Sequence, residues 1–380
     1  MYANTRGTLK LCRAARRKLY AALICLAIAC STLPNAAAVN LPQFPPGAVW
    51  HQPVDTATLH PNSQVMLDRL TALGGFGNGR MQIDFGFYVL YADANTPTAA
   101  TVAIPNDPDP YYSPDCEPLG SAVPLPVGGA IESQVGYSCD NFADDCHLVV
   151  VRGPVLFENY RSNVLANQLQ SQCLVKWNLA AVYGAKGRGE HCTSADAAGF
   201  PIAPMLFNSD EVSAAIARPN GDLGHAIRFI LPNTRMASDA SLGGVLGRLY
   251  VRPASHAGGP SGPSDSVPYG ARLRLKTSFD ISAYNPAAQV ILRTLKRYGM
   301  VLADGGLVAL TAENDRFTSV KWADLGIASR TFDQQVPAAK VFVGDFEVID
   351  TGARIGETYD CVREPEPSDN DLLLQSGFEN

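Results

Sequence analysis

Residues 285–304, NPAAQVILRTLKRYGMVLAD, contain the strongest local structural signals in the chain. Asn285 is suited to cap a helix that begins at Pro286, and Gly299 is suited to end it. Apolar side chains recur between them at the spacing of one helix face. That face consists of Val290, Ile291, Thr294, Leu295 and Tyr298. The apolar run after Gly299 is typical of a buried strand, so a packed helix over 286–298 leads directly into the core.

Segments with the character of β-strands surround this helix on both sides. Residues 146–183 contain three apolar runs separated by turns, which predicts antiparallel strands. Further strands are expected within 81–92, 225–232, 247–256 and 270–282. Helices are expected at 63–73 and within 208–217, where Ser209 is suited to cap the helix. The 33 glycines and 27 prolines indicate many turns. The pattern predicts a mainly β (α+β) protein, an antiparallel β-sandwich or jelly-roll-like fold with a few packed helices.

The N-terminus has the character of an export signal. Six basic residues precede the apolar run LYAALICLAIA, which is too short to span a bilayer, and the alanines at 36–38 suit cleavage. Cys30 offers an alternative, lipid attachment, although the residue three positions earlier is Ala27 rather than Leu. We therefore expect a secreted, periplasmic or cell-surface protein, with no membrane span.

The predicted organisation has three parts: a signal peptide at 1–38, a single large β-rich domain at 39–355, and an acidic tail at 356–380. Without the six basic residues of 1–38, 24 basic and 36 acidic residues remain, a net charge of −12. Nucleic-acid binding depends on clustered cations, so a nucleic-acid partner is not expected. We expect a monomer.

Six of the nine cysteines follow the predicted signal, and an even number in an exported chain predicts disulfide bonds. The candidates are Cys116, Cys139, Cys146, Cys173, Cys192 and Cys361. Sequence proximity favours the pairs Cys139–Cys146 and Cys173–Cys192, although six cysteines allow fifteen pairings. The sequence has no CxxC pair, so a zinc ribbon is not expected, and no close spacing of ligand residues indicates another metal. No cofactor is expected.

The stretch GEHCTSADAAG, residues 189–199, places Asp196 among small side chains. One interpretation is the start of a short helix that Thr193 or Ser194 caps. The other is a catalytic carboxylate with room for a bulky substrate beside it. Glycosidic hydrolysis needs two carboxylates, and we expect Glu211 to be the partner of Asp196. An Asp196→Asn variant should then lose turnover and keep its thermal stability.

Basic side chains on the strand segments are candidates for substrate binding. They are His225, Arg228, His256, Arg272 and Arg274. Such residues recognise carboxylate, sulfate or hydroxyl groups, and each also has a structural alternative, pairing with an acid on a neighbouring strand. No HExxH, P-loop, GxSxG or EF-hand pattern is present, which argues against the common metalloproteases, NTPases and α/β-hydrolases.

Five blocks of the chain resemble a group of exported bacterial proteins of unestablished activity, which often occur beside carbohydrate-binding modules. These blocks are CTSADAAGFPIAP, HAIRFILP, YVRPASH, YGARLRLKTSFDIS and AQVILRTLKRYGMVLAD. The resemblance covers most of 140–350, although relatives usually carry Asn where this chain has Gly305. The ending LLLQSGFEN resembles a C-terminal signature of exported proteins. The resemblance implies export and, by association, carbohydrate chemistry.

Three functions are compatible with these patterns. The first is an extracellular carbohydrate-active enzyme, a glycoside hydrolase that uses a carboxylate pair. The second is a polysaccharide lyase acting on a uronate polymer, which the cations at 272–276 favour. The third is a non-catalytic secreted carbohydrate-binding or surface protein. All three predict a polysaccharide or another extracellular polymer as the partner.

Overall fold

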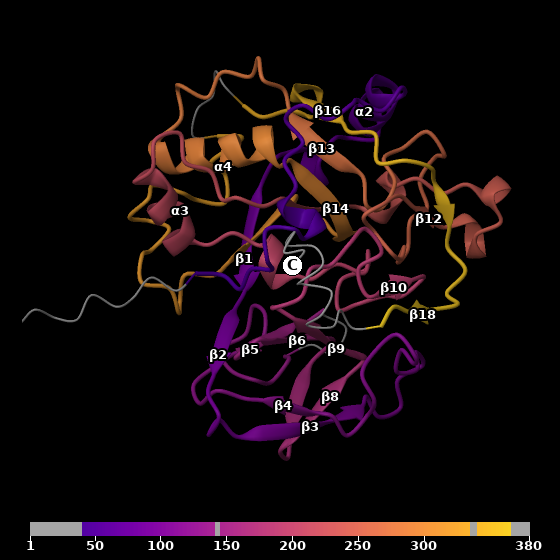
Figure 1. Cartoon of the computed structure of the whole chain (residues 1–380), viewed down its shortest axis with the longest axis vertical. Helices are drawn as coiled ribbons and strands as arrows, with labels where there is room; N and C mark the ends of the chain where they lie inside the picture. The colour runs from indigo at the N-terminus through magenta and orange to yellow at the C-terminus, as the bar shows by residue number, and fades with distance from the viewer. Residues whose placement is uncertain (1–39, 141–144, 335–339, 366–380) are drawn as a thin grey trace, which may run out of the picture. The chain divides into compact units, whose positions relative to one another are not determined.

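The computed structural model describes residues 40–140, 145–334 and 340–365 (Figure 1). The predicted signal peptide, Cys30 and the LLLQSGFEN ending lie outside the described residues. Within the described part, the α-helices are α2 (Ser63–Ala72), α3 (Ser209–Ile216) and α4 (Pro286–Arg297). No helix in these ranges is long and apolar enough to cross a membrane.

The largest sheet has six strands and mixes parallel with antiparallel pairs. Their order is β1 (Ile83–Phe87), β15 (Leu310–Glu313), β11 (Ile227–Leu231), β14 (Met300–Gly305), β13 (Arg272–Leu275) and β16 (Phe346–Val348). Two pairs, β1 with β15 and β11 with β14, are parallel. Strands β11 (IRFIL) and β14 (MVLADG) are mostly apolar and mostly buried, which is the usual character of parallel strands covered on both faces.

Helix α4 covers this sheet and confirms the prediction made from residues 285–304. The side chain of Asn285 accepts a hydrogen bond from the Ala288 amide, and Pro286 begins the helix. Gly299 has φ +69°, the left-handed conformation that ends many helices, and a side chain there would meet the Leu273 carbonyl. The apolar stripe packs against β13, and β14 follows at once. In Figure 1, α4 lies to the left of β13 and β14.

Two four-stranded sheets form a second region, at the bottom of Figure 1. One contains β2 (Val89–Ala92), β5 (Leu148–Arg152), β6 (Val155–Tyr160) and β9 (Cys173–Asn178). The other contains β4 (Ala122–Pro124), β3 (Thr98–Ala103), β8 (Gln168–Ser171) and β7 (Asn163–Leu165). Buried side chains of both sheets form one hydrophobic cluster. The expected antiparallel strands in 146–183 are confirmed, since β5, β6 and β9 pair in that way.

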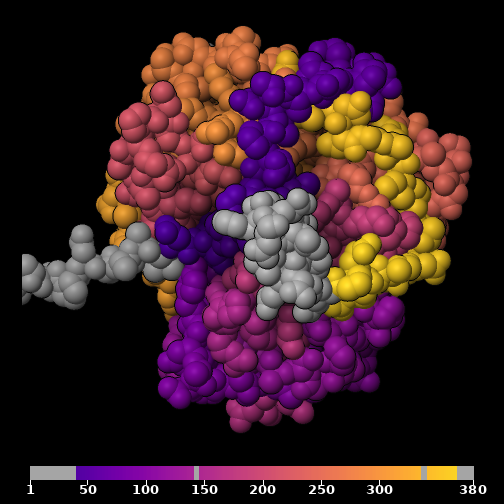
Figure 2. Space-filling model, viewed as in Figure 1, coloured from indigo at the N-terminus to yellow at the C-terminus, as the bar shows by residue number. Residues whose placement is uncertain are grey.

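Two short sheets bind the C-terminal strap, which we define as residues 355–363. Strand β17 (Ile355–Gly356) pairs with β12 (Leu249–Tyr250), and β18 (Val362–Arg363) pairs with β10 (Gly189–Glu190). The predicted domain boundary at 355 is therefore wrong, because the strap belongs to the folded domain. Figure 2 shows this C-terminal segment, in yellow, on the surface of the face in view.

All six predicted cysteines form disulfides, in the pairs Cys116–Cys173, Cys139–Cys146 and Cys192–Cys361. The predicted pair Cys139–Cys146 is confirmed. The predicted pair Cys173–Cys192 is wrong, because Cys173 begins β9 while Cys192 lies beside the strap. Proximity in sequence failed here because each of the two longer bridges joins segments that only the folded chain brings together.

The mainly β (α+β) class is confirmed, with mixed rather than purely antiparallel sheets. The sandwich or jelly-roll arrangement stays a prediction. Residues 81–92 form two strands in different sheets, β1 and β2, instead of one. Within 247–256, only Leu249–Tyr250 is a strand, and the remainder is loop.

Replacing Cys192 and Cys361 together by serine should lower the free energy of unfolding by about 2–5 kcal/mol, because their bridge restricts a long loop in the unfolded chain. The separation is 169 residues, against 7 for Cys139–Cys146. Denaturant unfolding of the Cys139/Cys146 double serine variant is the control, and its loss should be smaller. Equal losses in the two variants would contradict this account.

Candidate functional site

A cavity of about 580 Å³ lies where two parallel strands end. Asn233 follows β11, while Asp304 and Gly305 end β14, and all three residues line the cavity. Because the carboxyl ends of parallel strands meet at one edge of a sheet, that edge is a frequent position for binding sites. The central sheet therefore presents Asp304 to the cavity from a rigid element.

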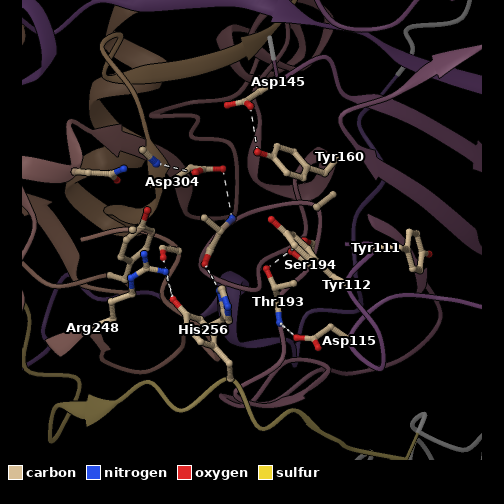
Figure 3. A pocket seen from close by; sticks show the side chains of 18 of the residues that line it. Tyr111, Tyr112, Asp115, Asp145, Tyr160, Thr193, Ser194, Arg248, His256 and Asp304 are labelled. Atoms are coloured by element: carbon tan, nitrogen blue, oxygen red, sulfur yellow. Dashed lines mark hydrogen bonds between the residues drawn. The ribbon is translucent and has the colours of Figure 1, made fainter. Parts of the chain in front are cut away.

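Aromatic rings form much of the cavity wall. The tyrosines that line it are Tyr111, Tyr112, Tyr160, Tyr269 and Tyr359. The rings of Tyr112 and Tyr160 are stacked with 6.5 Å between their centroids. The Tyr160 hydroxyl donates a hydrogen bond of 3.1 Å to the Asp145 carboxylate, which is exposed to solvent (Figure 3). Aromatic walls with a few convergent polar groups are typical of small-molecule and cofactor sites.

Asp304 is the most perturbed acid of the cavity. Its side chain is 26% exposed, and its carboxylate accepts a hydrogen bond of 2.7 Å from the Gly305 amide and one of 3.4 Å from Ala197. Burial and, second, the nearby Asp196 raise the pKa of Asp304, while Arg228 opposes the rise, and the resulting pKa is about 7. Asp304 is thus able to hold a proton close to neutral pH.

Asp196 lies behind the cavity wall, and no part of its side chain is exposed. Its Oδ2 accepts two hydrogen bonds from Arg228, of 2.5 Å and 3.2 Å. Arg228 also donates to the Thr311 hydroxyl, and its guanidinium lies 5.4 Å from the centroid of the Phe87 ring. Burial raises the pKa of Asp196, and Arg228 opposes the rise. The pair is an internal support, and Asp196 does not line the cavity. Its catalytic role stays a prediction that this burial does not favour.

The segment around Asp196 nevertheless forms part of the cavity. Thr193, Ser194, Ala195 and Ala197 line it. Ser194 Oγ accepts from the Asp196 amide and donates to the Phe200 carbonyl, which closes a turn. The predicted helix start is wrong, because residues 193–199 are a turn without helix. The small side chains border the cavity, as expected, while the carboxylate points away from it.

A buried ion pair supports the same wall from within. His147 Nδ1 lies 2.6 Å from Glu132 Oε2, and Nε2 donates to the Ala195 carbonyl at 3.0 Å. Burial lowers the pKa of His147, but the charge and hydrogen bond of Glu132 outweigh burial and raise it to about 9. His147 is therefore an imidazolium at neutral pH, and its charge favours the ionised form of Asp304.

Glu211 belongs to a different network. It lies in the first turn of α3, where Asn208 rather than Ser209 caps the helix, and its Oε1 is 3.1 Å from His225 Nε2. The second ring nitrogen of His225 donates to the Ala226 carbonyl. Neither Glu211 nor His225 lines the cavity. The structure does not form the expected pair of Asp196 and Glu211, since each carboxylate has its own cationic partner.

Of the five predicted substrate-binding residues, only His256 lines the cavity. Its Nδ1 donates a hydrogen bond of 2.7 Å to the Ala197 carbonyl. Arg228 is buried against Asp196, as described above. Arg272 donates to the carbonyls of Tyr298 and Gln52.

Arg274 has structural partners as well. It forms two hydrogen bonds with the Glu347 carboxylate and donates to carbonyls in the segment 54–57. The cations on β13 therefore fasten neighbouring segments to the sheet. The structural alternative given for them, pairing with an acid on the next strand, is confirmed for Arg274, because Glu347 lies opposite it on β16.

Sequence reasoning missed three carboxylates that line the cavity, Asp304, Asp145 and Asp115, and also Arg248. Asp115 accepts a hydrogen bond of 2.8 Å from the Thr193 amide. The available signal for Asp304 was its position, since a carboxylate directly after a buried parallel strand and before two glycines falls at a usual ligand-binding edge. Asp145 and Arg248 had no such signal, because they lie in irregular segments that long-range contacts bring to the cavity.

Comparison of the chain with protein-family models, curated proteins and solved structures gave no match. Functional roles must therefore be argued from the cavity itself. Among the described residues, no group of three or more histidine, cysteine, aspartate or glutamate side chains is arranged to hold a metal ion.

The structure changes the expected effect of an Asp196→Asn substitution. The amide would remove the nearer of the two carboxylate charges beside the buried Arg228 guanidinium, and the second, Asp304, is 3.8 Å away. Unfolding should therefore become easier, by up to about 3–5 kcal/mol. Thermal and denaturant unfolding measure this loss. The control is Asp68→Asn on the exposed face of α2, which should change stability by less than about 0.5 kcal/mol. A stable Asp196→Asn protein without activity would instead restore the catalytic interpretation.

Proposed function

We propose that the protein is an extracellular carbohydrate-active enzyme, a glycoside hydrolase whose carboxylate pair is Asp304 and Asp145. The observation that carries this proposal is that two of the three carboxylates in one tyrosine-lined cavity have contrasting environments, Asp304 being 26% exposed and Asp145 open to solvent. Pairs of acids whose surroundings push their pKa values apart are the usual basis of acid–base catalysis. The three disulfides indicate an oxidising compartment, in agreement with export.

Asp304 takes the role of the general acid. Because its pKa is about 7, a large fraction of the side chain carries a proton at neutral pH, and it can pass that proton to the departing glycosidic oxygen. The Gly305 and Ala197 amides hold the carboxylate in place through both steps. His147 and Arg228, both positively charged, stabilise the carboxylate that remains after proton transfer.

Asp145 takes the second role. It is exposed and lies within hydrogen-bond distance of the Tyr160 hydroxyl, which orients it. Asp304 and Asp145 both line the cavity, and both help to raise the pKa of Tyr160, after burial as the largest cause. Asp145 either activates water or attacks the sugar directly. Proton NMR of the first product anomer distinguishes inversion from retention.

The structure favours hydrolysis over the lyase alternative because the cations that suggested a lyase are occupied elsewhere. Arg272 and Arg274 bind backbone carbonyls and Glu347, and neither lines the cavity. A non-catalytic binding protein would not require an acid with a strongly raised pKa in its binding site. Reducing-end and near-ultraviolet assays on a panel of neutral and acidic polysaccharides separate the three functions, because only lyase products absorb.

Asp304→Asn and Asp145→Asn should each lower kcat on the cleaved polysaccharide by about 100- to 10,000-fold, the usual contribution of a general acid or base. An aryl glycoside with a good leaving group needs no protonation, so it should restore turnover to Asp304→Asn and not to Asp145→Asn. Asp68→Asn is the control and should keep full activity. Full activity in either cavity variant would refute the assignment.

The pH dependence of kcat/KM should show a fall above about pH 7. The general acid must be protonated, and Asp304 loses its proton as the pH rises through its pKa of about 7. Each further pH unit should then reduce kcat/KM about tenfold. Initial rates between pH 5 and pH 9 measure the profile, and the activated aryl glycoside should flatten its alkaline side. A profile that stays level to pH 9 on the polysaccharide would contradict this role for Asp304.

A further inference from the structure

We infer that the glycan bound in the cavity carries an anionic substituent, a carboxylate or a sulfate, and that Arg248 binds it. This inference deepens the proposed function, and its catalytic consequences rest on that function. Its basis is that Arg248, in the cavity wall, makes no hydrogen bond to a described residue from Nε or Nη2, the two nitrogens that can bind both oxygens of one acid. The contacts of Arg248 and of its neighbour His256 support it.

Several arginines of this chain take a carboxylate through the edge formed by Nε and Nη2, although Arg161 takes Asp107 through Nη1 and Nη2. Arg69 holds Asp265 through Nε and Nη2, at 2.8 Å and 2.7 Å, and Arg274 holds Glu347 through the same two nitrogens, at 3.1 Å and 2.8 Å. Arg228 uses this edge for Asp196. The planar fork of two parallel N–H groups matches the two oxygens of an acid.

Arg248 lines the cavity and uses neither Nε nor Nη2 within the described part of the chain. Only Nη1 is engaged, as a donor to the Tyr359 hydroxyl. Arg248 also forms no ion pair with any described carboxylate. A half-buried cation without a counter-charge is the natural partner of a ligand anion, because the ligand supplies the missing charge.

The strap holds Arg248 in place before a ligand arrives. Its guanidinium lies 5.5 Å from the centroid of the Tyr359 ring, and the Tyr359 hydroxyl donates to the carbonyls of Ala257 and Gly258. Glu357, which is fully buried, accepts from the amides of Tyr359 and Ala257. Little side-chain freedom is then lost on binding, which increases affinity.

His256 completes this side of the cavity. Its ring centroid is 5.2 Å from that of Tyr359. Because the Ala197 carbonyl can only accept, Nδ1 carries a proton, and in the neutral ring Nε2 remains as an acceptor for a sugar hydroxyl. Arg248 and His256 therefore form a subsite in which Arg248 binds an anionic group and His256 accepts a hydrogen bond from a hydroxyl group.

This subsite adjoins Asp304, since the Ala197 carbonyl accepts from His256 while the Ala197 amide donates to Asp304. It is separate from the second carboxylate, Asp145. In Figure 3, Arg248 and His256 lie on one side of the cavity, while Asp145 and Tyr160 lie on the other. An anion bound near Asp145 would be repelled, so the separation places the charged group on a sugar next to the cleaved bond. The enzyme would thus require an acidic residue at a defined distance from the scissile linkage.

Binding measured with the cleavage-silent Asp304→Asn protein tests the inference. The ligands are uronate polymers with their carboxyl-reduced forms, and sulfated glycans with their desulfated forms. We expect at least one acidic glycan to bind about 10- to 100-fold more tightly than its neutral form. Adding Arg248→Gln should remove that difference, while Arg248→Lys should keep part of it. The uronate and sulfate arms identify the anion.

Adding Arg316→Gln, an exposed arginine outside the cavity, is the control and should leave the preference intact. A preference for neutral glycans, binding to none of the ligands, or an acidic preference that survives Arg248→Gln would overturn the inference.

Cleavage assays with the wild-type protein distinguish a failure of this inference from a failure of the proposed function. An acidic glycan that binds through Arg248 without being cleaved would overturn the hydrolase alone, and cleavage of neutral glycans only would overturn the subsite alone.

Discussion

The buried ion pair of Asp196 and Arg228 is the interaction on which the cavity depends. Arg228 projects from β11, and Asp196 lies on the turn that forms the cavity wall, so the pair fixes that turn to the central sheet. Arg228 Nη2 also lies 3.8 Å from Asp304 Oδ2. One guanidinium thus serves two carboxylates. Because both cannot be ionised at low cost, each carboxylate raises the pKa of its neighbour, and the pKa of Asp304 is about 7.

The position of Asp304 between a rigid sheet and an aromatic cavity determines how its proton can be used. The carboxylate has a fixed backbone partner, Gly305, and two cations behind it, Arg228 and His147. Burial favours the protonated acid, while the cations favour the product of proton transfer. The opposing effects bring the pKa to about 7, where both forms are accessible. A site built only of surface carboxylates would lack this balance.

Local patterns predicted much of the fold, because their causes are local. The cap at Asn285, the stop at Gly299 and the strand after it follow from neighbouring residues. The antiparallel strands of 146–183 follow from turns and alternation. The parallel pairing of β11 with β14 and the bridge from Cys192 to Cys361 depend on contacts across long separations. No periodicity in the sequence encodes such contacts, so the mixed sheet and the strap were not foreseen.

The candidate site was located only in part for the same reason. The turn at 193–197 and His256 do line the cavity, but the acid singled out from that turn is the buried one. Two arginines differ in function because different nitrogens of their guanidinium groups are already hydrogen-bonded within the protein. Arg228 donates from Nε and Nη2 to Asp196 and so supports the cavity wall. Among the described residues, Arg248 donates only from Nη1, and its Nε and Nη2 stay available for a ligand. Both arginines lie in strand-like segments of the sequence, HAIRFILP and GRLYVRPASH. The difference between a supporting and a ligand-binding arginine therefore arises from the fold.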